Sequence, residues 1–139
     1  MDHQPDDAAS PEMVDAGERI LIERAGTVPP ETIAYGKFGE LVADEVDDCP
    51  PFEFPQDTDR MAALLRRVSR RHWKQPSDPL LCAIVVRADS GAPDRGFYRL
   101  ASEDFELPVG RTSFERLQFW MAQAKQVFDT DFQVRPGAD

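Results

Sequence analysis

Two cysteines and two histidines are the residues of this chain best suited to nucleophilic or metal chemistry, and their surroundings favour neither. Cys82 lies in the apolar run Leu80–Val86 and Cys49 lies in a proline-rich segment, so neither has a neighbouring base to lower its thiol pKa. His3 and His72 do not stand at metal-ligand spacing from the cysteines. We therefore predict no catalytic residue and no metal site.

Motifs that bind cofactors are also missing from the sequence. It has no glycine-rich phosphate loop and no pair of carboxylates that can be told apart from surface acids. No cofactor is implied and no small-molecule site is evident. We expect a non-catalytic binding or regulatory protein rather than an enzyme.

The strongest pattern is a segregation of positive charge. Residues 60–74 carry six basic side chains and no acid, and at helical spacing these side chains lie opposite the apolar Met61, Leu64 and Val68. Such a face is suited to phosphate contacts, with further arginines in the next segment adding to it. The predicted nucleic-acid-binding residues are Arg60, Arg66, Arg67, Arg70, Arg71, Lys74, Arg87, Arg95 and Arg99.

A second interpretation needs no nucleic acid. Asp57 and Asp59 begin this helix and arginines crowd its end, which is the order that the helix dipole favours. Bases are usually read by the first turns of a recognition helix, and here those turns carry acids. The chain as a whole has 16 basic and 26 acidic residues, a formal charge of −10, which opposes unassisted DNA binding.

Acidic residues gather just before the basic segment. They form an intramolecular partner for the basic helix, a docking patch for a basic protein, a DNA-like inhibitor surface, or simply a solvated face. The candidate docking residues are Glu40, Asp44, Glu45, Asp47 and Asp48.

The elements that position these residues follow from periodicity and from breaking residues. Ser10-Pro11 and Gly26 bound a helix over about 11–25, and Thr32 to Tyr35 reads as a short extended piece. Further helices are predicted over 37–46 and 58–73, separated by a loop with three prolines within six residues.

A β-hairpin is predicted after the third helix. The continuous apolar run that ends at Arg87 is typical of a buried strand, and Gly96–Ala101 would form the second strand across a polar turn. Thr112 to Glu115 offers a capping box for the last helix. Its apolar stripe of Phe114, Leu117, Met121, Ala124 and Phe128 is expected to face the core, and the helix also offers a homodimer interface.

This order of elements, with its Tyr35-Gly36 helix start, Pro79-Leu80-Leu81 strand and Gly96-Phe97-Tyr98 arm, resembles a winged helix and an uncharacterised group of small bacterial proteins. The resemblance implies an α+β, winged-helix-like fold with a small hairpin wing and a C-terminal helix. It brings no catalytic residue. The Tyr-Gly start is also similar to the DNA-alkyltransferase domain, but Cys82 lacks the Pro-Cys-His-Arg setting which that chemistry needs.

Length and composition predict one domain over residues 10–132 within a chain of 139 residues. The acidic tail 1–9 is expected to be disordered and the tail 133–139 to be frayed. The longest uncharged apolar run, Leu80–Val86, is too short to cross a membrane, and the acidic first twenty residues are unlike a secretory signal. We expect a cytoplasmic protein that partners nucleic acid or a basic protein.

Overall fold

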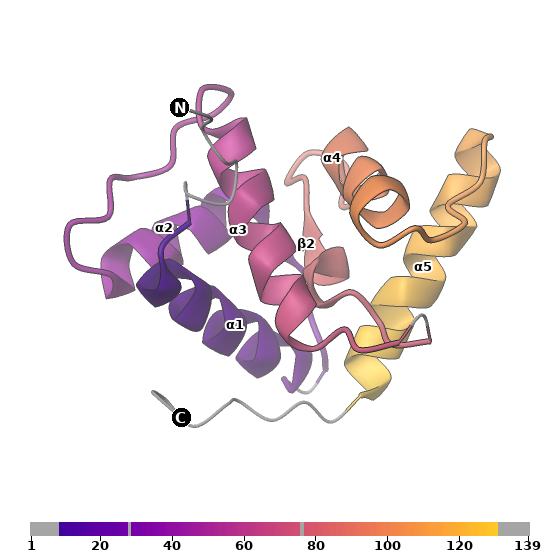
Figure 1. The fold of residues 1–139 in the computed structure, drawn as a ribbon, viewed down its shortest axis with the longest axis horizontal. Helices are drawn as coiled ribbons and strands as arrows, with labels where there is room; N and C mark the ends of the chain where they lie inside the picture. Colours follow the sequence, from indigo (N-terminus) through magenta and orange to yellow (C-terminus); the bar gives the residue numbers. More distant parts are fainter. Residues whose placement is uncertain (1–8, 28, 76, 131–139) are drawn as a thin grey trace.

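The first helix, α1 (Pro11–Ala25), begins and ends as its sequence predicts. The Ser10 side chain accepts a hydrogen bond from the backbone N–H of Met13 at 3.2 Å, and the helix ends at Gly26. In the computed structural model, which describes residues 9–27, 29–75 and 77–130, this helix packs against α2 (Tyr35–Glu45) and α3 (Thr58–Arg71). Figure 1 shows α3 in the middle of the fold, with α1 and α2 on one side and α4 and α5 on the other.

Close approach of the first three helices depends on Gly17. A Cβ atom at this position would lie 3.1 Å from the Phe38 ring and 3.2 Å from a Val68 methyl group. Phe38, Leu64 and Val68 are fully buried here, so a larger residue at position 17 would require these packed side chains to shift. The core is therefore centred on α3.

The predicted strand before Arg87 is mostly helical. Leu81–Ile84 forms a 3₁₀ helix, η2, and only Val85–Val86 forms a strand, β2. The backbone of the buried run is satisfied by side chains: Trp120 donates to the Ala83 carbonyl at 2.8 Å, and the Leu80 N–H donates to Gln123 at 2.8 Å. Because a buried backbone must have its polar groups paired, these side-chain hydrogen bonds take the place of strand pairing along the run.

The predicted hairpin is wrong. Gly96–Ala101 lies in α4 (Arg95–Arg99) and the π-helical turn η3 (Leu100–Asp104). Asp94 caps α4 by accepting from the Gly96 N–H at 2.9 Å, and this local hydrogen bond directs the chain into a helix. β2 instead pairs in parallel with β1 (Ile33–Ala34), with Ile33 opposite Val85.

The last helix, α5 (Ser113–Asp129), has the predicted capping box between Thr112 and Glu115. Its predicted core stripe is wrong in part, because Phe114, Leu117 and Met121 are 67%, 41% and 56% exposed. The helix packs on η2 through a face that is rotated from the predicted stripe and shares Ala124 with it; this face also includes Trp120, Gln123 and Val127. The hydrogen bonds of Trp120 and Gln123 to buried backbone groups turn this face of α5, and not the predicted stripe, toward the core.

The described chain is α+β by class, as predicted, and mainly helical with a two-stranded parallel sheet. Ala9, assigned to the disordered tail, is buried and packs on the core. The rest of that tail and the C-terminal tail 133–139 lie outside the described residues. Among the described helices none has the length and apolar character needed to span a bilayer.

Candidate functional site

The predicted basic face of α3 is largely built into the fold. Arg71 Nη1 lies 2.7 Å from Asp15 and 3.0 Å from Glu18, both on α1. The Glu18 side chain is 2% exposed, and His72 Nε2 lies 2.5 Å from its second oxygen. Two cationic or hydrogen-bonding partners therefore hold one buried carboxylate between α1 and α3.

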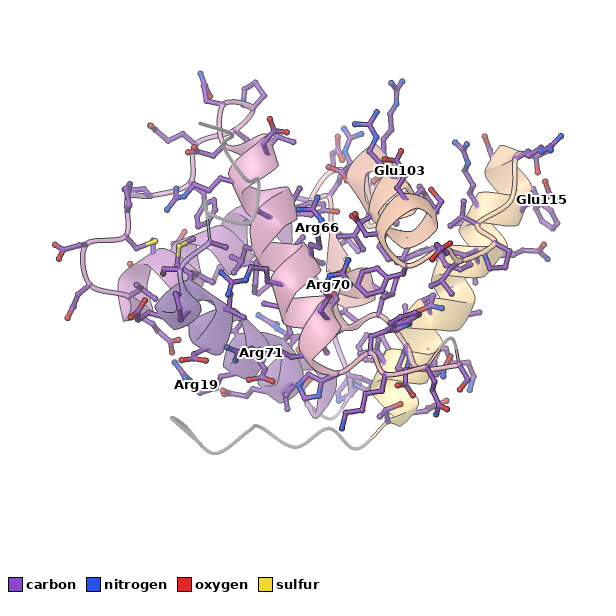
Figure 2. The ribbon with its side chains drawn as sticks, in the orientation of Figure 1. Arg19, Arg66, Arg70, Arg71, Glu103 and Glu115 are labelled. Atoms are coloured by element: carbon purple, nitrogen blue, oxygen red, sulfur yellow. The ribbon has the colours of Figure 1, made fainter. Side chains whose placement is uncertain are left out.

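The next arginines along α3 contact the π-helical turn and the start of the chain. Arg66 Nε donates to Asp104 at 2.8 Å, while the Arg70 guanidinium lies 5.0 Å from the centre of the Phe105 ring. Arg67 donates to the carbonyl of Ala9. Figure 2 shows Arg66, Arg70 and Arg71 along the central helix, between its neighbours.

Arg60 belongs to the proline-rich loop. Its Nη2 atom donates to the Pro50 carbonyl at 2.8 Å and to Cys49 Sγ at 3.2 Å, and its guanidinium lies 4.0 Å from the Phe52 ring centre. The loop lacks regular backbone pairing, so this one side chain supplies much of its anchoring.

The expectation that the basic face lies opposite the buried face is therefore wrong in part. Met61, Leu64 and Val68 are buried as expected, and Arg70 and Lys74 are exposed. Ala63, on the opposite side of the helix, is however fully buried, and the side chains of Arg60, Arg66 and Arg71 are less than a quarter exposed. α3 has neighbours on both flanks, which a periodicity based on one buried stripe does not anticipate.

The remaining predicted nucleic-acid residues are exposed but scattered. Lys74 lies beyond the end of α3, and Arg87 pairs with Asp89 at 2.7 Å. Arg95 and Arg99 line a shallow groove of about 470 Å³ with Arg116 and Tyr98, where Arg99 also lies 3.5 Å from Glu103.

The five acidic docking candidates are all exposed. Glu45 pairs with Arg19 on α1 at 2.7 Å and Glu40 with Lys37 on α2 at 3.4 Å, so the five do not neutralise α3. The acidic stretch 40–59, of which one interpretation is an intramolecular partner of the basic helix, meets that helix through Asp57, which lies 3.8 Å from Arg60. The acids that meet Arg66 and Arg71 come instead from η3 and α1. A groove of about 810 Å³ lies beside three of them, lined in part by Glu45, Asp47, Asp48, Glu12 and Asp15.

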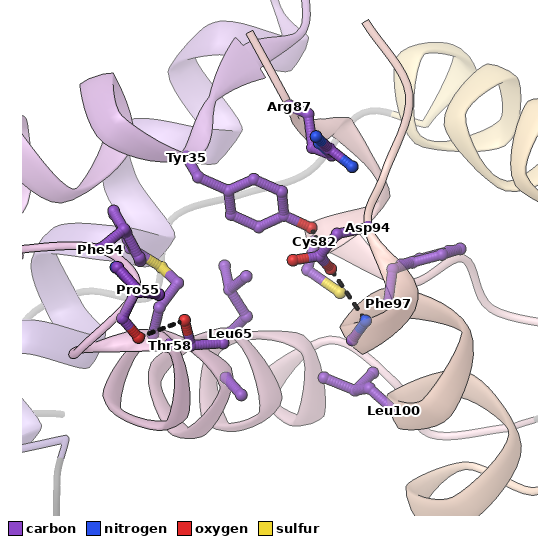
Figure 3. Close-up of a pocket in the computed structure, with 13 residues that line it drawn as sticks. Tyr35, Phe54, Pro55, Thr58, Leu65, Cys82, Arg87, Asp94, Phe97 and Leu100 are labelled. Atoms are coloured by element: carbon purple, nitrogen blue, oxygen red, sulfur yellow. Dashed lines mark hydrogen bonds between the residues drawn. The ribbon is translucent and has the colours of Figure 1, made fainter. Parts of the chain in front are cut away.

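A cavity that sequence reasoning missed lies between α3, the proline-rich loop and α4. It has a volume of about 390 Å³, within the range of ligand pockets. Most of its lining is apolar, as Figure 3 shows, and includes Phe54, Met61, Leu65, Phe97 and Leu100. No signal in the sequence joins these segments, because they are brought together only by the packing of α3 against η3 and η2.

One end of the cavity is polar. The Tyr35 hydroxyl donates to Asp94 Oδ1 at 3.2 Å, the same oxygen that accepts from the Gly96 N–H at 2.9 Å. Figure 3 shows Cys82 at this end, beside Tyr35 and Asp94, with Arg87 close to Tyr35. Tyr35 and Asp94 stand 59 residues apart, and the sequence placed Tyr35 at a helix start but Asp94 in the turn of a hairpin, so their contact was not predicted.

Burial keeps the Tyr35 hydroxyl and the Cys82 thiol, which lie beside Asp94, protonated. Burial raises the pKa of Tyr35 well above its ordinary value, and the negative potential of Asp94 adds to this effect. Burial also raises the pKa of the Cys82 thiol to about 11, against the opposing effect of its hydrogen bond with Ser69. Near neutral pH both groups are therefore in their neutral forms, which can take part in hydrogen bonds at this end of the cavity.

Within the described residues no cluster of three or more histidine, cysteine or acidic side chains is arranged to hold a metal ion. His72, the described histidine, is engaged with Glu18. Comparison of the chain with protein-family models, curated proteins and solved structures finds no match.

We predict that Arg71→Ala lowers the free energy of unfolding by about 2 to 4 kcal/mol, because the buried Glu18 carboxylate loses one of its partners. Arg99→Ala is the matched control: its side chain is 78% exposed, and it should change stability by less than about 0.5 kcal/mol. Urea unfolding of both variants measures the difference. Equal effects would show that Arg71 contributes no more than a surface arginine.

Alkylation under native conditions should label Cys49 much faster than Cys82, because Cys82 is buried and its thiol pKa is about 11. Below that pKa, each pH unit raises the thiolate fraction of Cys82 about tenfold, so its labelling should accelerate steeply between pH 7.5 and 9.5. Mass spectrometry of timed samples gives both rates. Rapid, pH-independent labelling of Cys82 would contradict this.

Proposed function

We propose that this protein is a non-catalytic module that binds a small, largely apolar molecule in the cavity beside Tyr35 and Asp94. The observation that carries the proposal is the cavity itself, with about 390 Å³ of space, an apolar lining and one polar end. A pocket with that combination is the usual form of a small-molecule site.

The walls of this cavity come from elements that different parts of the core hold in place. Met61 and Leu65 belong to α3, whose position is set by the contacts with α1, and Phe97 belongs to α4. Phe54 and Pro55 form the outer wall and belong to the loop anchored by Arg60. A site with rigid inner walls and one loop wall can admit a ligand without unfolding the core.

Two further expectations form part of the proposal. We propose a winged-helix-like arrangement only for the helices α1 to α3, because residues 96–101 are helical and form no wing. The protein is proposed to act in the cytoplasm.

Nucleic-acid binding has less support than the sequence implied. Arg60, Arg66, Arg67 and Arg71 are engaged inside the fold. This leaves the exposed but scattered Arg70, Lys74 and Arg87, and the groove of Arg95, Arg99 and Arg116, for phosphates. A basic protein partner on the groove beside Glu45, Asp47 and Asp48 is the corresponding alternative for the acidic surface.

A second candidate function is self-association through α5. Phe114, Leu117 and Met121 are three of the four large apolar side chains exposed in the described residues, and they share one stripe. α5 contains two acidic and two basic residues, so its net charge is zero in a chain of −10. Two acidic copies therefore meet with least repulsion along this helix.

The cavity is tested with 2-phenylethanol, a neutral probe of nine heavy atoms. We expect a dissociation constant on the order of 1 mM by calorimetry or thermal shift, because each atom of so small a ligand contributes only a few tenths of a kcal/mol. Ala62→Phe should abolish binding by filling the cavity, while Ala122→Phe on the exposed face of α5 should leave binding unchanged. Binding that persists in Ala62→Phe would place the probe elsewhere.

Self-association is tested by sedimentation velocity at several concentrations. Met121→Glu places a charge on the stripe and should shift a dimer to monomer, whereas the neighbouring Ala122→Glu adds the same charge on the exposed surface away from the stripe and should not. A parent protein that sediments as a monomer at high concentration would contradict the dimer.

A further inference from the structure

We infer that the ligand of this cavity is a small arylalkylamine, an aromatic ring with a short alkyl amine chain, bound in its cationic form with its ammonium group on Asp94. The inference rests on the proposed small-molecule function and deepens it by naming the class of ligand. It follows from the hydrogen bonds already made at the polar end, from the charges that line the cavity and from its apolar walls.

Asp94 has acceptor capacity to spare. Both of its hydrogen bonds, from the Tyr35 hydroxyl and the Gly96 N–H, reach Oδ1. Among the described residues no hydrogen bond reaches Oδ2, and Asp94 lines the cavity. An ionised carboxylate offers about four acceptor positions, so Oδ2 can take a donor from a ligand.

Tyr35 adds a second acceptor. Its hydroxyl hydrogen is committed to Asp94, which leaves the oxygen lone pairs for another donor. Burial and the nearby carboxylate keep this hydroxyl protonated. An ammonium group carries three donors and no acceptor, which fits two neighbouring acceptors and the open side of the cavity.

The charges around the cavity favour a cation. Asp94 and Arg87 are the charged side chains in the lining, and the guanidinium of Arg87 is paired with Asp89 at 2.7 Å outside it. Asp89 offsets part of the charge of Arg87, whose side chain is 55% exposed, whereas Asp94 is half-buried at the polar end, so its charge is the less screened of the two. A ligand carboxylate at this end would meet the like charge of Asp94, and the Tyr35 hydroxyl and the Gly96 N–H already donate to Asp94 Oδ1.

The walls suit an aromatic body. Phe54, Phe97 and the Tyr35 ring line the cavity together with Met61 and Leu65. Aromatic rings pack against one another in offset or edge-to-face arrangements, and a methionine sulfur adds favourable contact with a ring. A cavity of 150 Å³ holds benzene in another protein, so one of about 390 Å³ accommodates a ring with a short amine chain.

Three probes of matched size separate the inference from the function on which it rests. 2-Phenylethylamine, 2-phenylethanol and phenylacetate carry a positive, a neutral and a negative polar group, and each is titrated by calorimetry at 150 mM salt. We expect the amine to bind at least about tenfold more tightly than the alcohol, and phenylacetate more weakly than both.

Asp94→Asn removes the charge and keeps an oxygen that can accept from the Gly96 N–H, so α4 should remain capped. This variant should bind the amine and the alcohol about equally. Asp44→Asn, on an exposed site nine residues beyond Tyr35 along α2, makes the same change in net charge and should retain the preference. Tyr35→Phe should reduce the preference several-fold through loss of one acceptor, which gives a second test if Asp94→Asn folds poorly.

Equal affinity for the amine and the alcohol in the parent protein would overturn the inference and leave the proposed cavity function intact. A preference that survives both Asp94→Asn and Tyr35→Phe would also overturn it. Failure of all three probes to bind would overturn the proposed function and the inference together.

Discussion

The buried carboxylate of Glu18 is the constraint around which the molecule is arranged. A charge with 2% of its surface exposed is costly unless partners surround it, and Arg71 and His72 meet its two oxygens from α3. Gly17, its neighbour, lets α1, α2 and α3 approach closely. The two residues therefore fix both the distance and the rotation of α3 relative to α1.

That rotation determines what each side of α3 can do. Turning Arg71 toward α1 places Arg66 and Arg70 against η3, where they contact Asp104 and Phe105. Met61 and Leu65 then face the cavity under Tyr35. Arginines of α3 therefore hold neighbouring elements together through ion pairs. The cavity beside α3 is lined mostly by apolar side chains.

The helices could largely be predicted from the sequence, because their signals are local. Ser10, Gly26 and the Thr112 capping box marked ends that the structure confirms. The absence of the predicted hairpin could not be foreseen from local signals alone. The apolar run before Arg87 is buried, and its backbone groups are hydrogen-bonded by Trp120 and Gln123, which lie far along the chain. The cap at Asp94 and the helical spacing of Phe97, Leu100 and Ala101 were signals of α4 that the glycine-rich turn outweighed.

The candidate site was less predictable than the fold. A run of arginines at the surface and a run of arginines between helices have the same sequence, and only the positions of Glu18, Asp15 and Asp104 distinguish them. The polar end of the cavity is formed by a hydrogen bond between Tyr35 and Asp94, residues far apart in the sequence. Such long-range placement is beyond what spacing and periodicity can supply.

Binding at the cavity, and not along the arginines of α3, is tested most directly by mapping amide chemical shifts by NMR. 2-Phenylethylamine and a short DNA duplex are titrated in separate experiments. We expect the amine to shift the amides of Leu65, Gly96 and their neighbours, and the duplex to leave residues 66–71 unchanged. Shifts in residues 66–71 on adding DNA, with none around the cavity on adding the amine, would contradict this expectation.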